Sequence, residues 1–92
     1  MKAHYIVRGV VQGVGYRAFV MGLAKQYGIS GFVRNLTDGS VEIIAVASSE
    51  VLAQFKKELA AYSEGGASVD NIEETDYNAE QNDAEFDGFR IR

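Results

Sequence analysis

The chain has 92 residues, of which 47% are hydrophobic and 24% charged, a composition typical of one small globular domain with a modest core. It has no cysteine and one histidine, His4, which excludes disulfides, thiolate nucleophiles and multi-histidine metal sites. No apolar run approaches the roughly 18 residues that a membrane helix needs, and no signal peptide opens the chain. We therefore expect a single domain over residues 1–92, located in the cytoplasm.

The formal net charge is −4, but it is unevenly distributed. Residues 1–46 hold five bases and two acids, a net charge of +3, whereas residues 47–92 hold four bases and eleven acids, a net charge of −7. Eight of these acids lie within 70–87, which has no base. A net acidic chain argues against general binding to nucleic acid, which depends on neutralising phosphates. The basic first half still allows a small anion to bind.

The first third of the chain predicts a strand, a glycine-rich bend and a helix. Residues 4–11 are rich in Val, Ile and Tyr, as β-strands are, and the bend follows at 12–17. A helix is predicted over 17–27, and Gly28 is placed to end it. The apolar face of this helix has the spacing i, i+3, i+4, i+7, in Val20, Leu23, Ala24 and Tyr27.

The rest of the chain predicts a hairpin, a second helix and one or two further strands. The hairpin turns at Asp38-Gly39, a dipeptide typical of tight turns between strands. Ser48 or Ser49 can cap the second helix. The stripe of that helix consists of Leu52, Phe55, Leu59 and Tyr62, and Gly65-Gly66 stops it. The predicted strands are 31–36, 41–47 (apolar on both faces, so central), 69–77 and a possible short one within 86–92.

The predicted order β-α-β-β-α-β is that of an α+β ferredoxin-like sandwich. Neither helix can bury its apolar stripe alone, so we expect both on one face of an antiparallel sheet. Right-handed crossovers then place the first strand between the third and fourth, which gives the sheet order 4-1-3-2.

Glycines crowd the junction between the first strand and the first helix, at Gly9, Gly13 and Gly15. Without a Cβ atom, they let backbone N–H groups turn toward one point. The helix start adds unpaired N–H groups and the positive end of its dipole, and Arg17 adds a planar set of donors suited to phosphate. Together they can hold a phosphate-sized dianion. The alternative from spacing alone is a tight turn with an exposed arginine.

Three known motifs fit this chain poorly. A Walker A loop needs a lysine after its glycines, and none occurs between Lys2 and Lys25. Residues 13–18 match G-x-G-x-x-A, but the only suitably spaced acid, Asp38, falls in a hairpin turn, and 92 residues cannot build the two halves of a dinucleotide-binding fold. Residues 83–88 imitate a calcium loop whose last ligand would be residue 94. We expect that segment to be a solvated acidic connection.

Residues 9–17 (GVVQGVGYR) and 31–42 (GFVRNLTDGSVE) closely resemble two motifs of the acylphosphatase family, and 88–92 (GFRIR) resembles the C-terminal strand of that family. The match spans nearly the whole chain. The resemblance implies the ferredoxin-like fold that the order of elements predicts independently. It also implies hydrolysis of the carboxyl-phosphate bond of acyl phosphates to carboxylate and inorganic phosphate.

The resemblance also assigns roles. Arg17 would be the catalytic arginine and Asn35 the residue that positions the attacking water, whose proton would pass to a substrate phosphate oxygen. The phosphate-binding loop would consist of Gln12, Gly13, Val14, Gly15, Tyr16 and Arg17. Backbone N–H groups and Arg17 can hold the charge of a transferring phosphoryl group, so we expect neither a metal nor another cofactor.

Two residues depart from the pattern of the family. Val10 stands where many members have arginine, which removes a charge near the loop. Tyr16 stands where phenylalanine is usual and adds a hydroxyl to an aromatic ring expected to pack under the loop.

Other candidates have simpler interpretations. We expect His4 to be an ordinary strand residue. Arg34 precedes Asn35, so strand alternation should turn it away from the site. The aromatic residues expected in the core are Tyr5, Phe19, Phe32, Phe55 and Tyr62.

Two other classes of function compete with an enzyme. One is a non-catalytic module that binds phosphate or carbamoyl phosphate, like those joined to larger maturation enzymes. The other is an RNA-recognition module, which shares the order of elements but needs aromatic residues on the sheet face and a basic surface. Strand 41–47 has no aromatic residue, and the net charge has the wrong sign. We expect a monomer whose partners are an acyl phosphate substrate and inorganic phosphate as product and inhibitor, without nucleic acid or membrane.

Overall fold

The computed structural model describes residues 1–76 and 86–92 and confirms the predicted order of elements. The strands form one sheet in the order β4-β1-β3-β2-β5, which contains the predicted order 4-1-3-2. The predicted positions Tyr77 and 83–85 lie outside the described residues. The elements are β1 (Lys2–Val10), α1 (Tyr16–Tyr27), β2 (Ser30–Asn35), β3 (Val41–Val46), α2 (Ser49–Ala61), the 3-10 turn η1 (Glu64–Gly66), β4 (Ser68–Asp76) and β5 (Phe89–Ile91).

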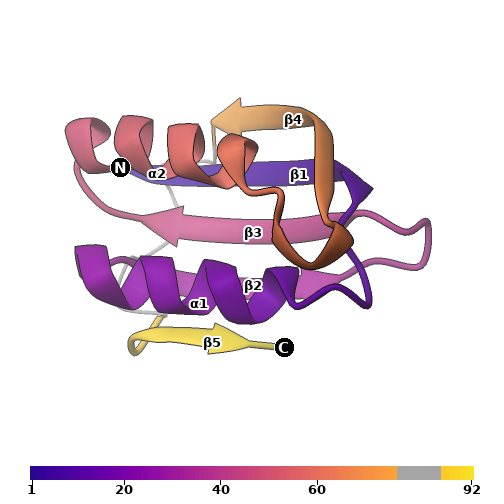
Figure 1. Cartoon of the computed structure of the whole chain (residues 1–92). Helices are drawn as coiled ribbons and strands as arrows, with labels where there is room; N and C mark the ends of the chain where they lie inside the picture. Colours follow the sequence, from indigo (N-terminus) through magenta and orange to yellow (C-terminus); the bar gives the residue numbers. More distant parts are fainter. Residues whose placement is uncertain (77–85) are drawn as a thin grey trace.

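The sheet is antiparallel except at one edge. β1 pairs with β3 and β4, and β2 pairs with β3, all antiparallel, so β3 is central as predicted. The short strand β5 instead runs parallel to β2, with Phe89 opposite Gly31 and Ile91 opposite Val33. Both helices lie on one face of the sheet, with α1 over the β2–β5 side and α2 over the β1–β4 side (Figure 1). The ends of β2 and β5 therefore lie near the start of α1.

The core lies between the sheet and the two helices. Along β1, Tyr5 and Val7 point into this core, whereas His4 and Arg8 belong to the other face of the sheet. The tilted rings of Tyr5 and Phe55 lie 6.3 Å apart, across the interface between β1 and α2. The helices contribute the buried residues Val20, Leu23, Ala24, Leu52, Phe55 and Leu59, which belong to the two predicted stripes.

The helix ends follow the predicted signals, with one exception. Gly28 ends α1 in a left-handed conformation, and Ser48 caps α2 by accepting a hydrogen bond from the Val51 N–H at 3.2 Å. The second helix ends at Ala61, so Tyr62 is its C-cap rather than a helical residue. Among the described residues, no helix has the length and apolarity needed to cross a membrane.

Phe32 is buried, as expected, but not beneath the helices. It is 9% exposed, but it lies on the opposite face of the sheet, because strand alternation gives the helix-facing position to Val33. Its ring lies 6.1 Å from that of Phe86, and the Arg92 guanidinium lies 4.4 Å from its centroid. These contacts bury Phe32 without a helix above it.

Candidate active site

The predicted glycine loop (residues 12–17) leaves β1, crosses the end of the sheet and enters α1. Two of its residues have the left-handed backbone that disfavours side chains, with φ of 74° at Gly13 and 78° at Gly15. No atom lies within 4 Å of where a Cβ would stand at either position. The backbone conformation, and not lack of space, therefore requires glycine here.

The start of α1 has no internal cap. Gly15 is the N-cap and has no side chain to accept a hydrogen bond, and the first turn contains no acidic residue. The Phe19 N–H bonds to the Gly15 carbonyl at 3.1 Å, while the N–H groups of the preceding turn have no carbonyl behind them in the helix. These donors and the helix dipole favour an anion at this end of the helix.

Arg17 lies beside these donors. It is half-buried and lines a cavity of about 210 Å³ together with Gly13, Gly15 and Ala18, and Ile91 of β5 forms part of the wall. Arg17 takes part in none of the ion pairs found among the described residues. Its charge is therefore available to a ligand in the cavity.

Two other arginines have partners. Arg8 contacts Asp38 at 3.2 Å and Glu73 at 3.1 Å, and Arg34 contacts Glu42 at 2.5 Å. Arg34 is exposed and lies on the face away from the helices, as predicted. Neither of them lines the cavity that holds Arg17.

Tyr16, the last-but-one residue of the glycine loop, is buried at the start of α1. Its ring is 1% exposed, and its hydroxyl donates a hydrogen bond to the Leu59 carbonyl of α2 at 3.0 Å. Burial raises the pKa of this phenol far above its usual value. The rings of Phe19 and Tyr62 lie 5.9 and 5.8 Å away. The hydroxyl that distinguishes Tyr16 from phenylalanine thus joins α1 to α2.

Gln12 connects the loop to the β2–β3 hairpin, a role that the sequence did not indicate. Its side-chain amide nitrogen donates to the carbonyl oxygens of Leu36 and Ser40, each at 2.8 Å. The Leu36 N–H donates to the Ser40 carbonyl at 2.9 Å and closes the same turn. The side chain of Gln12 is therefore occupied by protein, and only its backbone can face a ligand in the loop.

Asn35 is the last residue of β2, directly before that turn. Alternation places it on the helix side of the sheet with Val33, which is fully buried. Its side-chain oxygen Oδ1 is buried and accepts no hydrogen bond from the described residues. Asn35 does not itself line the cavity with Arg17, but Gln12 joins the loop to the residue next to it.

Asp38 stabilises the hairpin turn. Its carboxylate accepts hydrogen bonds from the side-chain hydroxyl of Ser40 and, at 3.0 Å, from the Ser40 N–H. These bonds, with a smaller contribution from Arg8, hold the pKa of Asp38 below its usual value. The turn thus occupies the acid that a dinucleotide site would need.

The other residues that the sequence singled out lie outside the cavity that holds Arg17. Val14 packs partly buried against the core, and Val10 is 53% exposed at the end of β1. His4 lies on the helix-free face with its Nε2 2.9 Å from the Glu42 carboxylate. In the described part of the chain, no cluster of three or more His, Cys, Asp or Glu residues could hold a metal ion.

Comparison with known proteins identifies the family. The acylphosphatase family model matches residues 3–91. An acylphosphatase of Pasteurella multocida is 42% identical over 92 residues, covering 100% of this chain and 98% of that protein. The crystal structure of acylphosphatase from Bacillus subtilis has a TM-score of 0.87 and 33% identity, covering 99% of this chain and 97% of that one.

A larger protein contains a similar domain. The crystal structure of T. kodakarensis HypF has a TM-score of 0.83 and 30% identity, covering 100% of this chain but only 12% of that one. The family model and the full-length relative nevertheless agree with the two sequence motifs and with the fold. This chain belongs to the acylphosphatase family of hydrolases.

Proposed function

We propose that this chain hydrolyses acyl phosphates, with the phosphoryl group held by the glycine loop and Arg17. The observation that carries the proposal is that Arg17 lies in a cavity at the uncapped start of α1 and forms no ion pair with the described residues. Backbone N–H groups and a guanidinium are the donors that phosphoryl transfer needs, because charge spreads over the equatorial oxygens in the transition state.

The reaction needs few side chains. Water attacks phosphorus, the bond between phosphorus and the acyl oxygen breaks, and the acyl group leaves as a carboxylate. A carboxylate is a stable leaving group, so no strong acid has to protonate it. A phosphate oxygen takes the proton of the attacking water, and the products are carboxylate and inorganic phosphate. This route needs no acidic or basic catalyst, and among the described residues Arg17 is the one charged residue that lines the cavity.

Asn35 is proposed to orient the attacking water. An amide does not titrate usefully, but its oxygen can accept a hydrogen bond from one water proton and fix the direction of attack. The buried Oδ1 without a partner among the described residues supports this role, because such an acceptor ordinarily has a partner. Its link through Leu36 to Gln12 would hold the water position at a constant distance from the loop.

The test is turnover of benzoyl phosphate by two variants. Arg17→Ala should lose roughly 10³-fold in rate, by analogy with arginines that act in phosphoryl transfer. Asn35→Ala should lose on the order of 10²-fold in kcat with little loss of phosphate affinity. Arg34→Ala is the control, because Arg34 is exposed on the opposite face of the sheet. Turnover by Arg17→Ala at the wild-type rate would overturn the proposal.

Two further measurements define the mechanism. Inorganic phosphate should inhibit competitively, since it is the product that occupies the loop. We also propose that no metal takes part, because Arg17 and the backbone donors can supply the positive charge. EDTA should then leave the rate unchanged, and inhibition that added divalent cations reverse would contradict a metal-free reaction.

A non-catalytic binding module is the second candidate, favoured by the similarity to one domain of the much longer HypF chain. Such a module would bind phosphate or carbamoyl phosphate without consuming acyl phosphates. Calorimetric binding of phosphate together with no turnover of benzoyl, acetyl or carbamoyl phosphate would support it against the hydrolase.

A further inference from the structure

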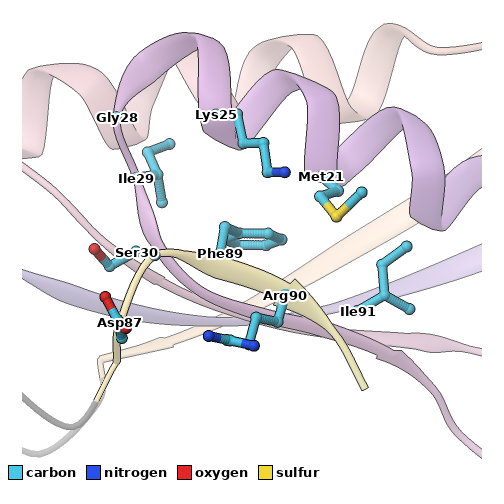
Figure 2. Close-up of a pocket in the computed structure, with 10 residues that line it drawn as sticks. Met21, Lys25, Gly28, Ile29, Ser30, Asp87, Phe89, Arg90 and Ile91 are labelled. Atoms are coloured by element: carbon cyan, nitrogen blue, oxygen red, sulfur yellow. The ribbon is translucent and has the colours of Figure 1, made fainter.

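A second, larger cavity of about 620 Å³ lies between α1 and β5 (Figure 2). We call it the α1–β5 groove. Met21 and Lys25 reach into it from α1, and Phe89 and Ile91 reach into it from β5, whereas the side chain of Arg90 points away from the helix (Figure 2). The groove thus has one wall from each element.

The groove continues the cavity that holds Arg17. Ile91 lines both spaces, so its side chain is the boundary at which one gives way to the other. On the helix, Ala18 lines the cavity and Met21 lines the groove, and residues three apart lie one above the other on the same helix face. A ligand held at Arg17 can therefore extend into the groove along α1.

The groove is apolar near the cavity and carries charged residues at its far end. Met21 is half-buried and Ile91 is 39% exposed, which leaves apolar surface open to a ligand, whereas Phe89 is 5% exposed and belongs to the core. Lys25 lies in the last turn of α1 and forms no ion pair among the described residues. Asp87 also lines the groove, at the end near Ser30 (Figure 2).

We infer that the α1–β5 groove binds the acyl group of the substrate and favours acyl groups with an apolar body and a second anionic group at the far end. This inference rests on the proposed function. A mixed anhydride whose phosphate occupies the loop must place its acyl group outside that cavity, and the groove begins there. Met21 and Ile91 would contact the apolar body.

Lys25 would pair with the distal anion. Lys25 is eight positions after Arg17, which corresponds to about 12 Å along the helix axis. Helical side chains lean toward the N-terminus, so the ammonium group of Lys25 lies closer to the cavity than its backbone does. The carboxylate of Asp87 would repel an anion on its own side of the groove, which directs the distal anion toward α1. The length of the groove thus suits a compact acyl group rather than a long chain.

The test compares three substrates: acetyl phosphate, benzoyl phosphate and 4-carboxybenzoyl phosphate. The last carries a carboxylate on a rigid ring and cannot cyclise. In Met21→Ala, the ratio of kcat/KM for benzoyl to that for acetyl phosphate should fall about fivefold, because the ring loses apolar contact. In Lys25→Gln, the ratio for 4-carboxybenzoyl to benzoyl phosphate should fall about two- to fivefold, the size typical of an exposed ion pair.

Lys57→Gln is the matched control. Lys57 is exposed on α2, outside the groove, and its substitution changes the net charge by the same amount. It should leave both substrate ratios unchanged. Equal shifts in Lys25→Gln and Lys57→Gln would overturn the inference, as would ratios that neither Met21→Ala nor Lys25→Gln alters.

The outcomes separate the inference from the proposed function. If the wild-type chain turns over none of the three substrates, the hydrolase assignment fails and the inference fails with it. If it turns over all three substrates but the ratios of kcat/KM are the same in Met21→Ala and Lys25→Gln as in the wild type, only the inference fails. A preference for the 4-carboxybenzoyl group that depends on Lys25 supports both.

Discussion

The side-chain amide of Gln12 lies 2.8 Å from the carbonyl oxygen of Leu36, the residue that follows Asn35. An equal bond to Ser40 makes this amide a bridge between the glycine loop and the β2–β3 hairpin. The proposed water-positioning residue and the phosphate loop come from distant parts of the chain, so a direct bond between their neighbours holds the two halves of the site together.

Removal of this bridge should reduce both stability and rate. Gln12→Ala removes both hydrogen bonds between the loop and the hairpin, and we expect a loss of about 1–2 kcal/mol in the free energy of unfolding. The value of kcat should also fall, because the glycine loop and Asn35 are no longer held in a fixed position relative to each other. Urea unfolding and benzoyl phosphate turnover measure the two effects. Gln26→Ala, at an exposed position of α1, should change neither.

Asn35→Ala should separate activity from stability. Its buried Oδ1 has no partner among the described residues, so the folded state carries the cost of a desolvated acceptor. We expect the variant to unfold at the same or a higher urea concentration than the wild type, although its kcat falls. Asn71→Ala, exposed on β4, is the control for loss of an amide. A clear loss of stability in Asn35→Ala would instead indicate a structural amide.

Substitution by alanine should have opposite effects on stability at Gly15 and at Gly22. Gly15 has a φ of 78°, so Gly15→Ala should cost about 1–2 kcal/mol of stability and weaken phosphate binding. Gly22 lies inside α1, and no atom lies within 4 Å of its Cβ position, so Gly22→Ala should stabilise by about 0.5–1 kcal/mol. Thermal unfolding and phosphate titration of both variants test this contrast.

The buried tyrosines predict alkaline unfolding. Burial raises the pKa of Tyr5 to about 12 and that of Tyr16 further, whereas both titrate near 10 in an unfolded chain. Above that pH the unfolded state loses protons that the folded state keeps, so stability should be complete below pH 10 and fall as the pH rises toward 12. Tyr16→Phe should weaken this fall while losing about 1 kcal/mol at pH 8 with the Leu59 bond. Equal pH slopes for the two proteins would contradict the assignment to Tyr16.

Salt should accelerate the enzyme at low concentration. The chain carries a net charge of −4, and residues 47–92 contribute −7, so an anionic substrate is repelled at long range. Screening this repulsion with added NaCl should raise kcat/KM until chloride competes at the loop. If kcat/KM instead falls from the lowest salt concentration onward, Arg17 and nearby basic residues dominate the electrostatic field that the substrate meets.

Local patterns predicted most of the fold. Helical spacing located Val20, Leu23 and Leu59 in the core, and Asp38-Gly39 located the hairpin turn, because both signals depend on neighbours in sequence. The sequence also predicted a glycine-rich bend before the helix, and the positive φ values of Gly13 and Gly15 agree with it. The roles proposed for Arg17 and Asn35 in the reaction depended on the resemblance to the family.

The rest depends on contacts between distant residues. No local signal states that β5 pairs in parallel with β2, so the place of Ile91 in the wall of the Arg17 cavity could not be predicted. The face of the sheet on which Phe32 is buried could not be predicted, because an apolar strand with Phe32 next to Val33 permits either phase of alternation. The hydrogen bonds of Gln12 likewise link residues 24 and 28 positions apart.

The acidic strand β4 also bears on whether two copies of the chain can associate through their sheets. It forms one edge of the described sheet, and its exposed residues include Asp70, Glu73 and Glu74. An edge strand offers unpaired backbone groups to any other strand, which is a route to aggregation. Two such edges brought together would place like charges side by side, and the opposite edge, β5, has only three residues to offer. The acids that we expect to slow the approach of substrate should therefore also protect the sheet from extension by a second copy.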